Sequence, residues 1–484
     1  MEFTHLEPAS VFHYFNEICQ IPHGSYNTKA ISDYCVNFAK SHHLTCYQDD
    51  TNNVIIVKEA SPGYENAKPV ILQGHLDMVC EKTDDSDHDF EKDPLKLRVD
   101  GDWLSAEGTT LGGDDGIAVA YGLAILEDAS LAHPKLYVIF TTEEEVGMDG
   151  AHAIDLTPVK DAGYMINLDS EEEGYILAGC AGGSRAHITL PITWEKATGL
   201  CCELAVSGLA GGHSGGEINR FGANGSVLLG MVLNTLSKDF DLKIAALTGG
   251  SKDNVIPKKS TADIVITPAD KDAIQAKLAE LEAYYHKVYG QRDPNLTITL
   301  TDNGEGNADV MDKASADRAI FTLTQAPNGV QAMSFDIEGL VETSLNLGVM
   351  ATRDHDLYLS FALRSSVGAA RQALEDKLKA FVDYIGGTFD IASSYPAWEF
   401  RRESILRDKM SAIYNDMFGS EPVVQAIHAG LECGLISNKL PDLDIVSIGP
   451  DMQDIHTPDE RLSIASTKRM WDYLLAVLAS MKTN

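Results

Sequence analysis

The stretch Val70–Val79, which reads Val-Ile-Leu-Gln-Gly-His-Leu-Asp-Met-Val, constrains the fold more than any other part of this sequence. It begins as a continuous apolar run, which is typical of a strand buried on both faces of a parallel sheet. His75 and Asp77 follow at a spacing of two, so on a strand their side chains share one face. A carboxylate beside an imidazole fixes the tautomer for metal binding or acid–base chemistry. An ordinary core histidine, satisfied by its neighbour, is the alternative interpretation of this pair.

Four later stretches favour the functional interpretation, because each ends in similar chemical groups. They are the turn and helix start at Asp114-Asp115, the apolar run 136–140 before Glu143-Glu144-Glu145, the run 164–168 before Asp169, and the run 445–448 before His456. Ligands of open α/β sheets bind at the carboxyl ends of the strands. We therefore predict an α/β domain with a mostly parallel sheet and a polar site at this edge.

The middle of the chain has a different pattern. Between residues 187 and 395, two blocks each contain a strand followed by an amphipathic helix, with strands at 262–266 and 357–363. The metal-ligand pattern returns only after this region. We predict one domain formed by residues 1–186 and 396–484, interrupted by an inserted α+β domain at 187–395.

The groups at the strand ends suit a pair of metal ions. The candidate ligands are His75, Asp114, Glu144 or Glu145, Asp169 and His456. Zinc binds histidine nitrogen and carboxylate oxygen, and a catalytic site keeps one position open for water. Two ions that share a carboxylate can activate a bridging water. The absence of cysteine among these residues disfavours a structural zinc site.

Composition excludes several other classes of function. A chain of 484 residues is too long for one core, and its net charge of −34 argues against nucleic acid or an anionic membrane as a partner. Eight cysteines without a CxxC pair indicate reduced thiols in a cytoplasmic protein. We find no signal peptide pattern, and no apolar run approaches the roughly 18 residues of a membrane span.

Several ordered motifs carry a resemblance to a known family. They are Gly74-His75-Leu76-Asp77, Gly113-Asp114-Asp115-Gly116, Glu144-Glu145-Val146-Gly147, Asp169-Ser-Glu-Glu-Glu-Gly, Gly179-Cys-Ala-Gly-Gly, His428-Ala-Gly-Leu-Glu-Cys-Gly, His456 and Pro458-Asp-Glu-Arg-Leu. Together they resemble the M20 family of metallopeptidases, in particular its aminoacyl-histidine dipeptidase branch. The resemblance covers essentially the whole chain. It implies hydrolysis of dipeptides with a free amino terminus, including those that end in histidine.

The resemblance also implies roles for individual residues. His75, Asp114 and Asp169 would hold one Zn²⁺, and Asp114, Glu145 and His456 the other, with Mn²⁺ or Co²⁺ as possible substitutes. Asp77 would orient His75, and Glu144 would be the general base. Counting back from Gly147 resolves the register of the three glutamates, because the family reads Glu-Glu-x-Gly. A cis peptide bond between Asp114 and Asp115 is implied as well.

The resemblance implies that residues 1–186 and 396–484 form the catalytic domain, and that the inserted domain is a lid or dimerisation domain that contributes to substrate binding. His213, in a glycine-rich segment, matches the family's donor to the oxyanion, while Asn254 and Arg364 match positions that bind the substrate carboxylate. Gly430 would offer its backbone to the substrate. The resemblance further implies a homodimer through the inserted domain, and His213 can come from a partner subunit in relatives. If these residues bind substrate, the two domains must close for catalysis.

Two alternatives stay open at this point. One is an M20-type aminoacylase or carboxypeptidase that acts on N-acyl amino acids, and the other is a non-catalytic metal-binding or assembly protein with the same fold. The full set of ligands together with Glu144 argues against the second alternative. The sequence departs from the family pattern at Gly113, where alanine is common, and in the acidic segment 451–455, and neither departure removes a ligand.

Overall fold

The computed structural model describes residues 5–220 and 222–482, and these divide into two compact units. Unit 1 contains the residues up to Gly179, Phe400–Ala426, and the residues from Leu431 onwards. Unit 2 contains Cys180–Glu399 and Ile427–Gly430. The division into domains at residues 187 and 395 concerns which parts of the chain fold independently, and it remains a prediction.

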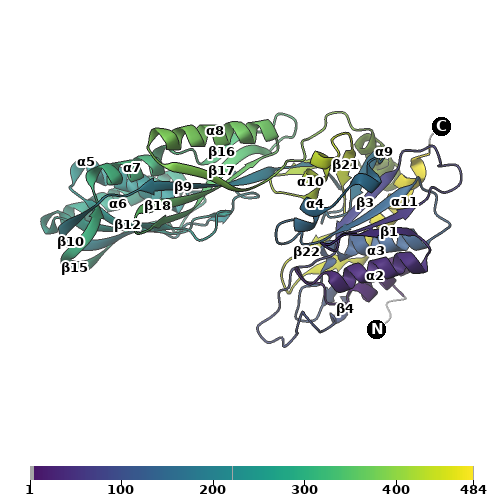
Figure 1. The fold of residues 1–484 in the computed structure, drawn as a ribbon. Coiled ribbons are helices and arrows are strands. Elements are labelled where there is room, and N and C mark those ends of the chain that lie inside the picture. Colours follow the sequence, from purple (N-terminus) through teal and green to yellow (C-terminus); the bar gives the residue numbers. More distant parts are fainter. Residues whose placement is uncertain (1–4, 221, 483–484) are drawn as a thin grey trace. The chain divides into compact units, whose positions relative to one another are not determined.

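Unit 1, which contains both the N-terminal and C-terminal parts of the chain (Figure 1), is built on an eight-stranded sheet. The strand order is β1-β2-β6-β3-β7-β21-β8-β20. Its strands are β1 (Thr45–Gln48), β2 (Val54–Lys58), β3 (Val70–His75), β6 (Leu136–Thr141), β7 (Tyr164–Asn167), β8 (Tyr175–Cys180), β20 (Val423–Ile427) and β21 (Asp444–Ser447). The central strands β6, β3, β7 and β21 are parallel, whereas β1, β2 and β8 pair in antiparallel fashion. The fold is thus α/β as predicted, and the parallel arrangement is limited to the centre of this sheet.

The helices of unit 1 bury the sheet and its loops. They are α1 (Ala9–Ile18), α2 (Lys29–Ser41), α3 (Gly113–Glu127), α4 (Asp149–Ala153), α9 (Ile405–Phe418), α10 (Glu432–Lys439) and α11 (Ile464–Ser480). Helix α3 is apolar on all sides and buried along almost its whole length, as expected of a helix inside a core. The crossover from β3 through α3 leads to β6 on one side of β3, whereas the crossover from β6 through α4 leads back past β3 to β7. Because crossovers between parallel strands are right-handed, two crossovers in opposite directions place α3 and α4 on opposite faces of the sheet.

A smaller sheet of unit 1 contains the strands on either side of His456, one of the predicted metal ligands. Its order is β22-β23-β5-β4, formed by β22 (Met452–Gln453), β23 (Arg461–Ser463), β5 (Trp103–Ala106) and β4 (Leu97–Asp100). Strands β22 and β23 flank the loop that contains His456. The Ser463 side chain caps α11 by accepting the backbone N–H of Ser466.

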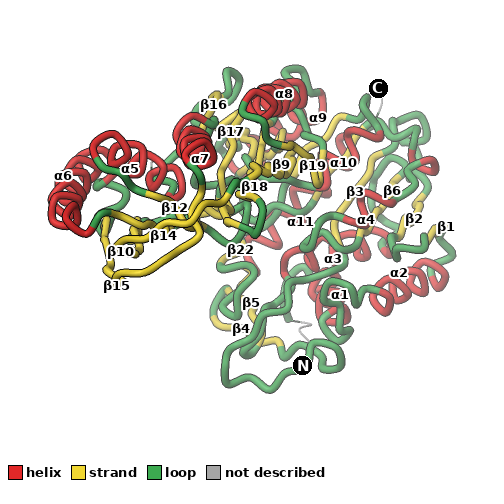
Figure 2. Tube along the Cα trace, turned by 60° about the vertical axis from the view of Figure 1, so that its left-hand side comes forward, coloured by secondary structure: helices red, strands yellow, loops and turns green. Residues whose placement is uncertain are grey.

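Unit 2 is a long antiparallel sheet with helices along one face (Figures 1 and 2). The sheet contains β9 (Gly182–Pro191), β10 (Trp194–Ser207), β12 (Lys243–Gly249), β14 (Ser260–Ile266), β15 (Thr297–Met311), β16 (Gly329–Met333), β17 (Val341–Thr352), β18 (Asp356–Ser365) and β19 (Thr388–Tyr395). Its helices are α5 (Gly225–Asp239), α6 (Lys271–Tyr289), α7 (Lys313–Gln325) and α8 (Gly368–Tyr384), and β11 (Gly212–His213) pairs separately with β13 (Val255–Ile256). A separate apolar core fills the space between the helices and the sheet.

Candidate metal centre

The parallel strands of unit 1 bring the predicted ligands to one edge of the sheet. In register, His75 at the end of β3 lies opposite Thr141 at the end of β6, and Gln73 lies opposite Asn167 at the end of β7. The chain positions that follow these strand ends are the turn with Glu144 and Glu145 and the segment with Asp169. Strand β3 is buried at every position but ends at His75, so Asp77 lies two residues beyond its end. The prediction that both residues lie on the strand was therefore wrong.

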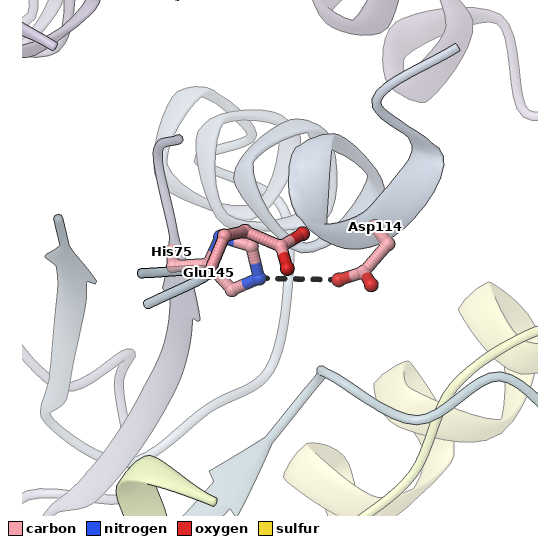
Figure 3. A group of neighbouring side chains, drawn as sticks. All are labelled: His75, Asp114 and Glu145. Carbon is pink, nitrogen blue, oxygen red and sulfur yellow. Dashed lines mark hydrogen bonds and ion pairs between the residues drawn. The ribbon is translucent and has the colours of Figure 1, made fainter. Parts of the chain in front are cut away.

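Asp114 stands between the two histidines of the site. Its Oδ1 lies 3.1 Å from Nε2 of His75, and its Oδ2 lies 3.1 Å from Nε2 of His456. His75 comes from the end of β3 and Asp114 from the first turn of α3, and the two face each other in Figure 3. A carboxylate with one oxygen directed at each histidine has the geometry of a ligand shared by two ions.

The remaining candidate ligands complete the two sides of this arrangement. Oε2 of Glu145 lies 3.0 Å from Nε2 of His456, and Oδ1 of Asp169 lies 3.7 Å from Nε2 of His75. Potential ligand atoms of His75, Asp114 and Glu145 all lie within 4.8 Å of one another. The five ligands predicted from sequence are thus brought together by five distant segments of unit 1.

Asp115 is an additional carboxylate at the site. It forms a second such group with His75 and Asp169, also within 4.8 Å. Its Oδ2 accepts the backbone N–H of His75 at 3.2 Å, and the peptide bond between Asp114 and Asp115 is cis. Burial raises the pKa of the Asp115 carboxyl well above its usual value, with a further contribution from the charge of Asp169. Asp115 was not among the metal ligands predicted from the sequence.

The electrostatics of the cluster fit a bound cation. Burial raises the pKa of Asp169 to about 7, because a desolvated carboxylate among other acids is costly. The hydrogen bonds that His456 donates to Asp114 and Glu145 raise its pKa to about 11, so the carboxylates hold a proton on this imidazole. Oε1 of Glu145 is buried and has no hydrogen-bond partner. This orphaned oxygen and the demand for positive charge are what a divalent ion would satisfy.

Asp77 connects the ligand segments instead of facing the centre. Its oxygens accept the backbone N–H groups of Glu144 at 3.0 Å and Glu145 at 3.3 Å, and the hydroxyl of Ser25 at 2.9 Å. Its Oδ1 lies 3.4 Å from Nδ1 of His75, whose closer contact is the Asp77 carbonyl at 2.9 Å. Asp77 is therefore placed to orient both the imidazole and the turn that carries two acidic residues.

Glu144 is placed close to this cluster. Burial raises the pKa of its carboxyl well above the usual value; the charge of His75 opposes this effect, and the charges of Asp169 and Glu432 reinforce it. A carboxyl with a raised pKa is suited to accept and then return a proton near neutral pH.

Three acidic residues outside the predicted set support the site. Glu143 accepts the hydroxyl of Thr28 at 2.9 Å and thereby holds the segment before α2. Glu432 is fully buried and accepts the Gln73 amide at 2.6 Å, and burial raises the pKa of its carboxyl to about 8. Glu460 accepts backbone N–H groups at the start of α3. Glu432 and Glu460 lie in motifs that carried the family resemblance, and this was the only signal for them in the sequence.

Unit 2 gathers the predicted substrate-binding residues around a second polar cluster. Arg364 on β18 is buried and donates from Nη1 to the Tyr395 hydroxyl at 3.1 Å, while its Nε has no hydrogen-bond partner. A Cβ added at Gly430 would lie 2.7 Å from the Tyr395 ring, so this backbone packs closely there. Burial lowers the pKa of His213, with a further contribution from the charge of Arg364.

The turn that carries His213 is fixed by its neighbours within unit 2. Its strand β11 pairs with β13, and the carbonyl of Asn254 accepts the backbone N–H of Ser214 at 2.9 Å. His428 lies in the same unit and interacts through Nε2 with the Ser344 hydroxyl at 2.7 Å. Burial lowers the pKa of His428 to about 3, with a further contribution from the charge of Arg364. This histidine is neutral at physiological pH and was not predicted as a site residue.

Comparison with known proteins places the chain in a family. The model of peptidase family M20/M25/M40 matches residues 71–480. The chain is 36% identical over 484 residues to the cytosol non-specific dipeptidase of Escherichia coli K12, covering 99% of this chain and 98% of the relative. The crystal structure of aminoacylhistidine dipeptidase from Vibrio alginolyticus matches with a TM-score of 0.91 and 35% identity, over 99% of this chain and 98% of the other. A tripeptidase from Staphylococcus aureus shares the fold, with a TM-score of 0.56 and 13% identity, over 99% of both chains. The chain is therefore an enzyme that belongs to peptidase family M20/M25/M40.

Proposed function

We propose that this enzyme is a dipeptidase that hydrolyses dipeptides with a free amino terminus, including those that end in histidine. The observation that carries the proposal is the position of Asp114, with one oxygen directed at His75 and the other at His456. Whole-length similarity to a cytosol non-specific dipeptidase and to an aminoacylhistidine dipeptidase supports this substrate class over N-acyl amino acids.

We further propose that the enzyme holds two zinc ions. His75, Asp114 and Asp169 would bind one ion, and Asp114, Glu145 and His456 the other. Histidine nitrogen and carboxylate oxygen suit zinc, and they also admit Mn²⁺ or Co²⁺. When bound, the ions would lower the pKa of a water molecule and polarise the scissile carbonyl.

Glu144 would act as the general base and then as the general acid. Its carboxylate accepts a proton from the attacking water, and the resulting carboxylic acid donates that proton to the leaving amine. The raised pKa of this buried group suits the second step, because a stronger base holds the proton until the amine leaves. Asp77 supports both steps by fixing the Glu144 backbone.

The polar cluster of unit 2 would recognise the substrate. The Arg364 guanidinium would bind the terminal carboxylate together with Asn254, because a planar fork of N–H donors matches a carboxylate. The neutral His213 imidazole would donate a hydrogen bond to the oxyanion of the tetrahedral intermediate. Gly430 would contribute its backbone, and the close contact with Tyr395 leaves no room there for a larger residue.

Two properties of the protein in the cell complete the proposal. We propose a cytoplasmic location, supported by the name of the Escherichia coli relative and by eight cysteines that include no CxxC pair. None of the helices in the described residues is long and apolar enough to cross a bilayer. We also propose a homodimer formed through the inserted domain, which sedimentation velocity tests directly.

Hydrolysis of a dipeptide panel tests the proposed function. The enzyme is stripped with a chelator, reloaded with Zn²⁺, Mn²⁺ or Co²⁺ in turn, and assayed on free dipeptides and on their N-acetyl analogues. We expect activity on the free dipeptides that is lost with the metal and restored by it. Preferential hydrolysis of the N-acetyl compounds would overturn the substrate assignment. The Glu144→Gln variant should bind metal normally and lose about 10²–10⁴-fold in kcat.

A further inference from the structure

Glu460 makes an unusual set of hydrogen bonds with a segment far away in sequence. The residue is 2% exposed, and its Oε2 accepts the backbone N–H groups of Leu111 at 2.8 Å and Gly112 at 3.1 Å. Its Oε1 accepts those of Gly113 at 2.8 Å and Asp114 at 3.4 Å. Four consecutive N–H groups that converge on one carboxylate form an anion-binding nest, here filled by a side chain of the same protein.

The backbone around this nest has little freedom to move. Gly112 adopts a left-handed conformation with φ 67°, and a Cβ at this position would lie 2.9 Å from the sulfur of Met78. A Cβ at Gly113 would lie 3.3 Å from Oε1 of Glu460 and 3.1 Å from the sulfur of Met452. The carboxylate therefore sits directly against the backbone that leads into the first turn of α3.

The same hydrogen bonds link two of the proposed metal ligands. Glu460 belongs to the loop of His456, and its own N–H is accepted by the carbonyl of Thr457 at 3.1 Å. His456 in turn contacts Oδ2 of Asp114 at 3.1 Å. The two loops thus meet twice, once through the imidazole and the aspartate and once through the Glu460 carboxylate.

We propose that Glu460 is a positioning residue that holds Asp114 against His456 and thereby sets the affinity of the ion bound by Asp114, Glu145 and His456. This inference rests on the proposed two-metal site. It does not rest on the proposed substrate, because the effect is on metal binding in the absence of any peptide. Residues that orient metal ligands from outside the ligand set commonly change metal affinity by about 10–100-fold when they are replaced.

The Glu460→Gln variant tests this role. An amide keeps the shape of the carboxylate but places an NH₂ group opposite two of the four backbone N–H groups. The matched control is Asp459→Asn, which removes the same charge from the neighbouring, exposed residue. Zinc-free protein is titrated with Zn²⁺ in competition with a chromophoric chelator, which gives the number of ions and both dissociation constants without an activity assay.

We expect the unmodified enzyme and Asp459→Asn each to bind two ions, and we expect each of the two dissociation constants to be closely similar in the two proteins. Glu460→Gln should bind one ion normally and the other about 10–100-fold more weakly, and excess Zn²⁺ should restore most of kcat. If Glu460→Gln does not fold, Glu460→Asp keeps the charge but withdraws it from the nest, and it should show the same selective weakening. The proposal would be overturned if both dissociation constants of the Glu460 variant lay within about twofold of those of the unmodified enzyme. It would also be overturned if the unmodified enzyme bound a single ion. Absence of dipeptide hydrolysis with normal metal binding would contradict only the proposed function.

Discussion

Replacing Asp77 with asparagine is expected to weaken metal binding while leaving the fold intact. The carboxylate is 1% exposed and accepts the backbone N–H groups of Glu144 and Glu145, one on each oxygen. In Asp77→Asn one oxygen becomes an NH₂ group. In either orientation of the amide, one of these two N–H groups then faces another donor.

The size of the effect follows from that single unsatisfied donor. Leaving a buried N–H without an acceptor costs about 1–3 kcal/mol, and each ~1.4 kcal/mol corresponds to a tenfold change in an equilibrium constant. Since the affected turn carries Glu145, we expect the dissociation constant for zinc to rise by about 10–100-fold. This range matches the usual effect of residues that orient metal ligands. The kcat/KM value measured at limiting zinc should fall by a similar factor.

Chelator competition measures the zinc constants of Asp77→Asn, and thermal unfolding of the metal-free protein checks that the fold is retained. Ser25→Ala is the matched control, because it removes only the hydroxyl that donates to the same carboxylate at 2.9 Å. The dissociation constants of Ser25→Ala for zinc should change by less than about fivefold, because the lost hydrogen bond contributes under about 1 kcal/mol. Zinc constants for Asp77→Asn that equal those of the control would refute this account of Asp77.

Three further outcomes are expected. Arg364→Lys should raise KM by about tenfold with a smaller change in kcat, measured by steady-state kinetics, because an ammonium cannot form the planar fork that binds a carboxylate. The pKa of His428 is about 3 in the folded protein and near 6.5 in the unfolded chain, so the unfolded chain takes up the proton first and stability falls as the pH falls. Between pH 7 and pH 5 this residue should lower the free energy of unfolding by about 2 kcal/mol. Denaturant titration of His428→Asn should therefore show a weaker dependence of stability on pH. Glu432→Gln should unfold near the temperature of the unmodified enzyme in calorimetry, since burial raises the Glu432 pKa to about 8 and keeps the acid neutral. Glu432→Ala should lose about 1–3 kcal/mol, because it removes the shorter of the two hydrogen bonds that the Gln73 amide donates.

The sequence was sufficient to predict where the polar site lies, because parallel strands must end at a common edge. Apolar runs identified β3, β6 and β7, and the acidic or histidine residues after them are brought together in the structure. The direction of the outer strands was not predictable in the same way. A buried run such as β2 has the same composition in either direction, so the antiparallel pairing of β1, β2 and β6 could not be read from the pattern.

The contacts that support the ligands were also beyond the reach of sequence patterns. Glu460 and Gly113 are 347 positions apart, and a contact between two loops leaves no periodicity in either segment. The placement of Asp77 is a related case. The spacing of two suggested a shared strand face, yet the strand ends at His75 and the closer contact is made by the Asp77 carbonyl beyond that end. Local spacing predicted the neighbour correctly and the backbone conformation incorrectly.

The acidic residues of the site divide into two groups according to what they bind. Asp77, Glu143 and Glu460 each accept at least one backbone N–H from another segment, and so does one oxygen of Asp115, whose other oxygen is buried without a partner. Such donors stabilise a buried carboxylate without any countercharge from a side chain. These four residues therefore connect the loops through contacts that form without a bound ion.

The second group is what makes the site a candidate for metal. Asp114 and Glu145 have their described contacts with histidine nitrogens, and Glu145 retains a buried oxygen without a partner. Asp169 likewise faces His75, at 3.7 Å. Because backbone donors do not satisfy these three carboxylates, their burial in one place is stable only if positive charge is supplied, by protons on the imidazoles or by a cation. Residue type cannot separate the two groups, since both consist of aspartate and glutamate. They differ in their hydrogen-bond donors, because backbone amides reach the first group and not the second.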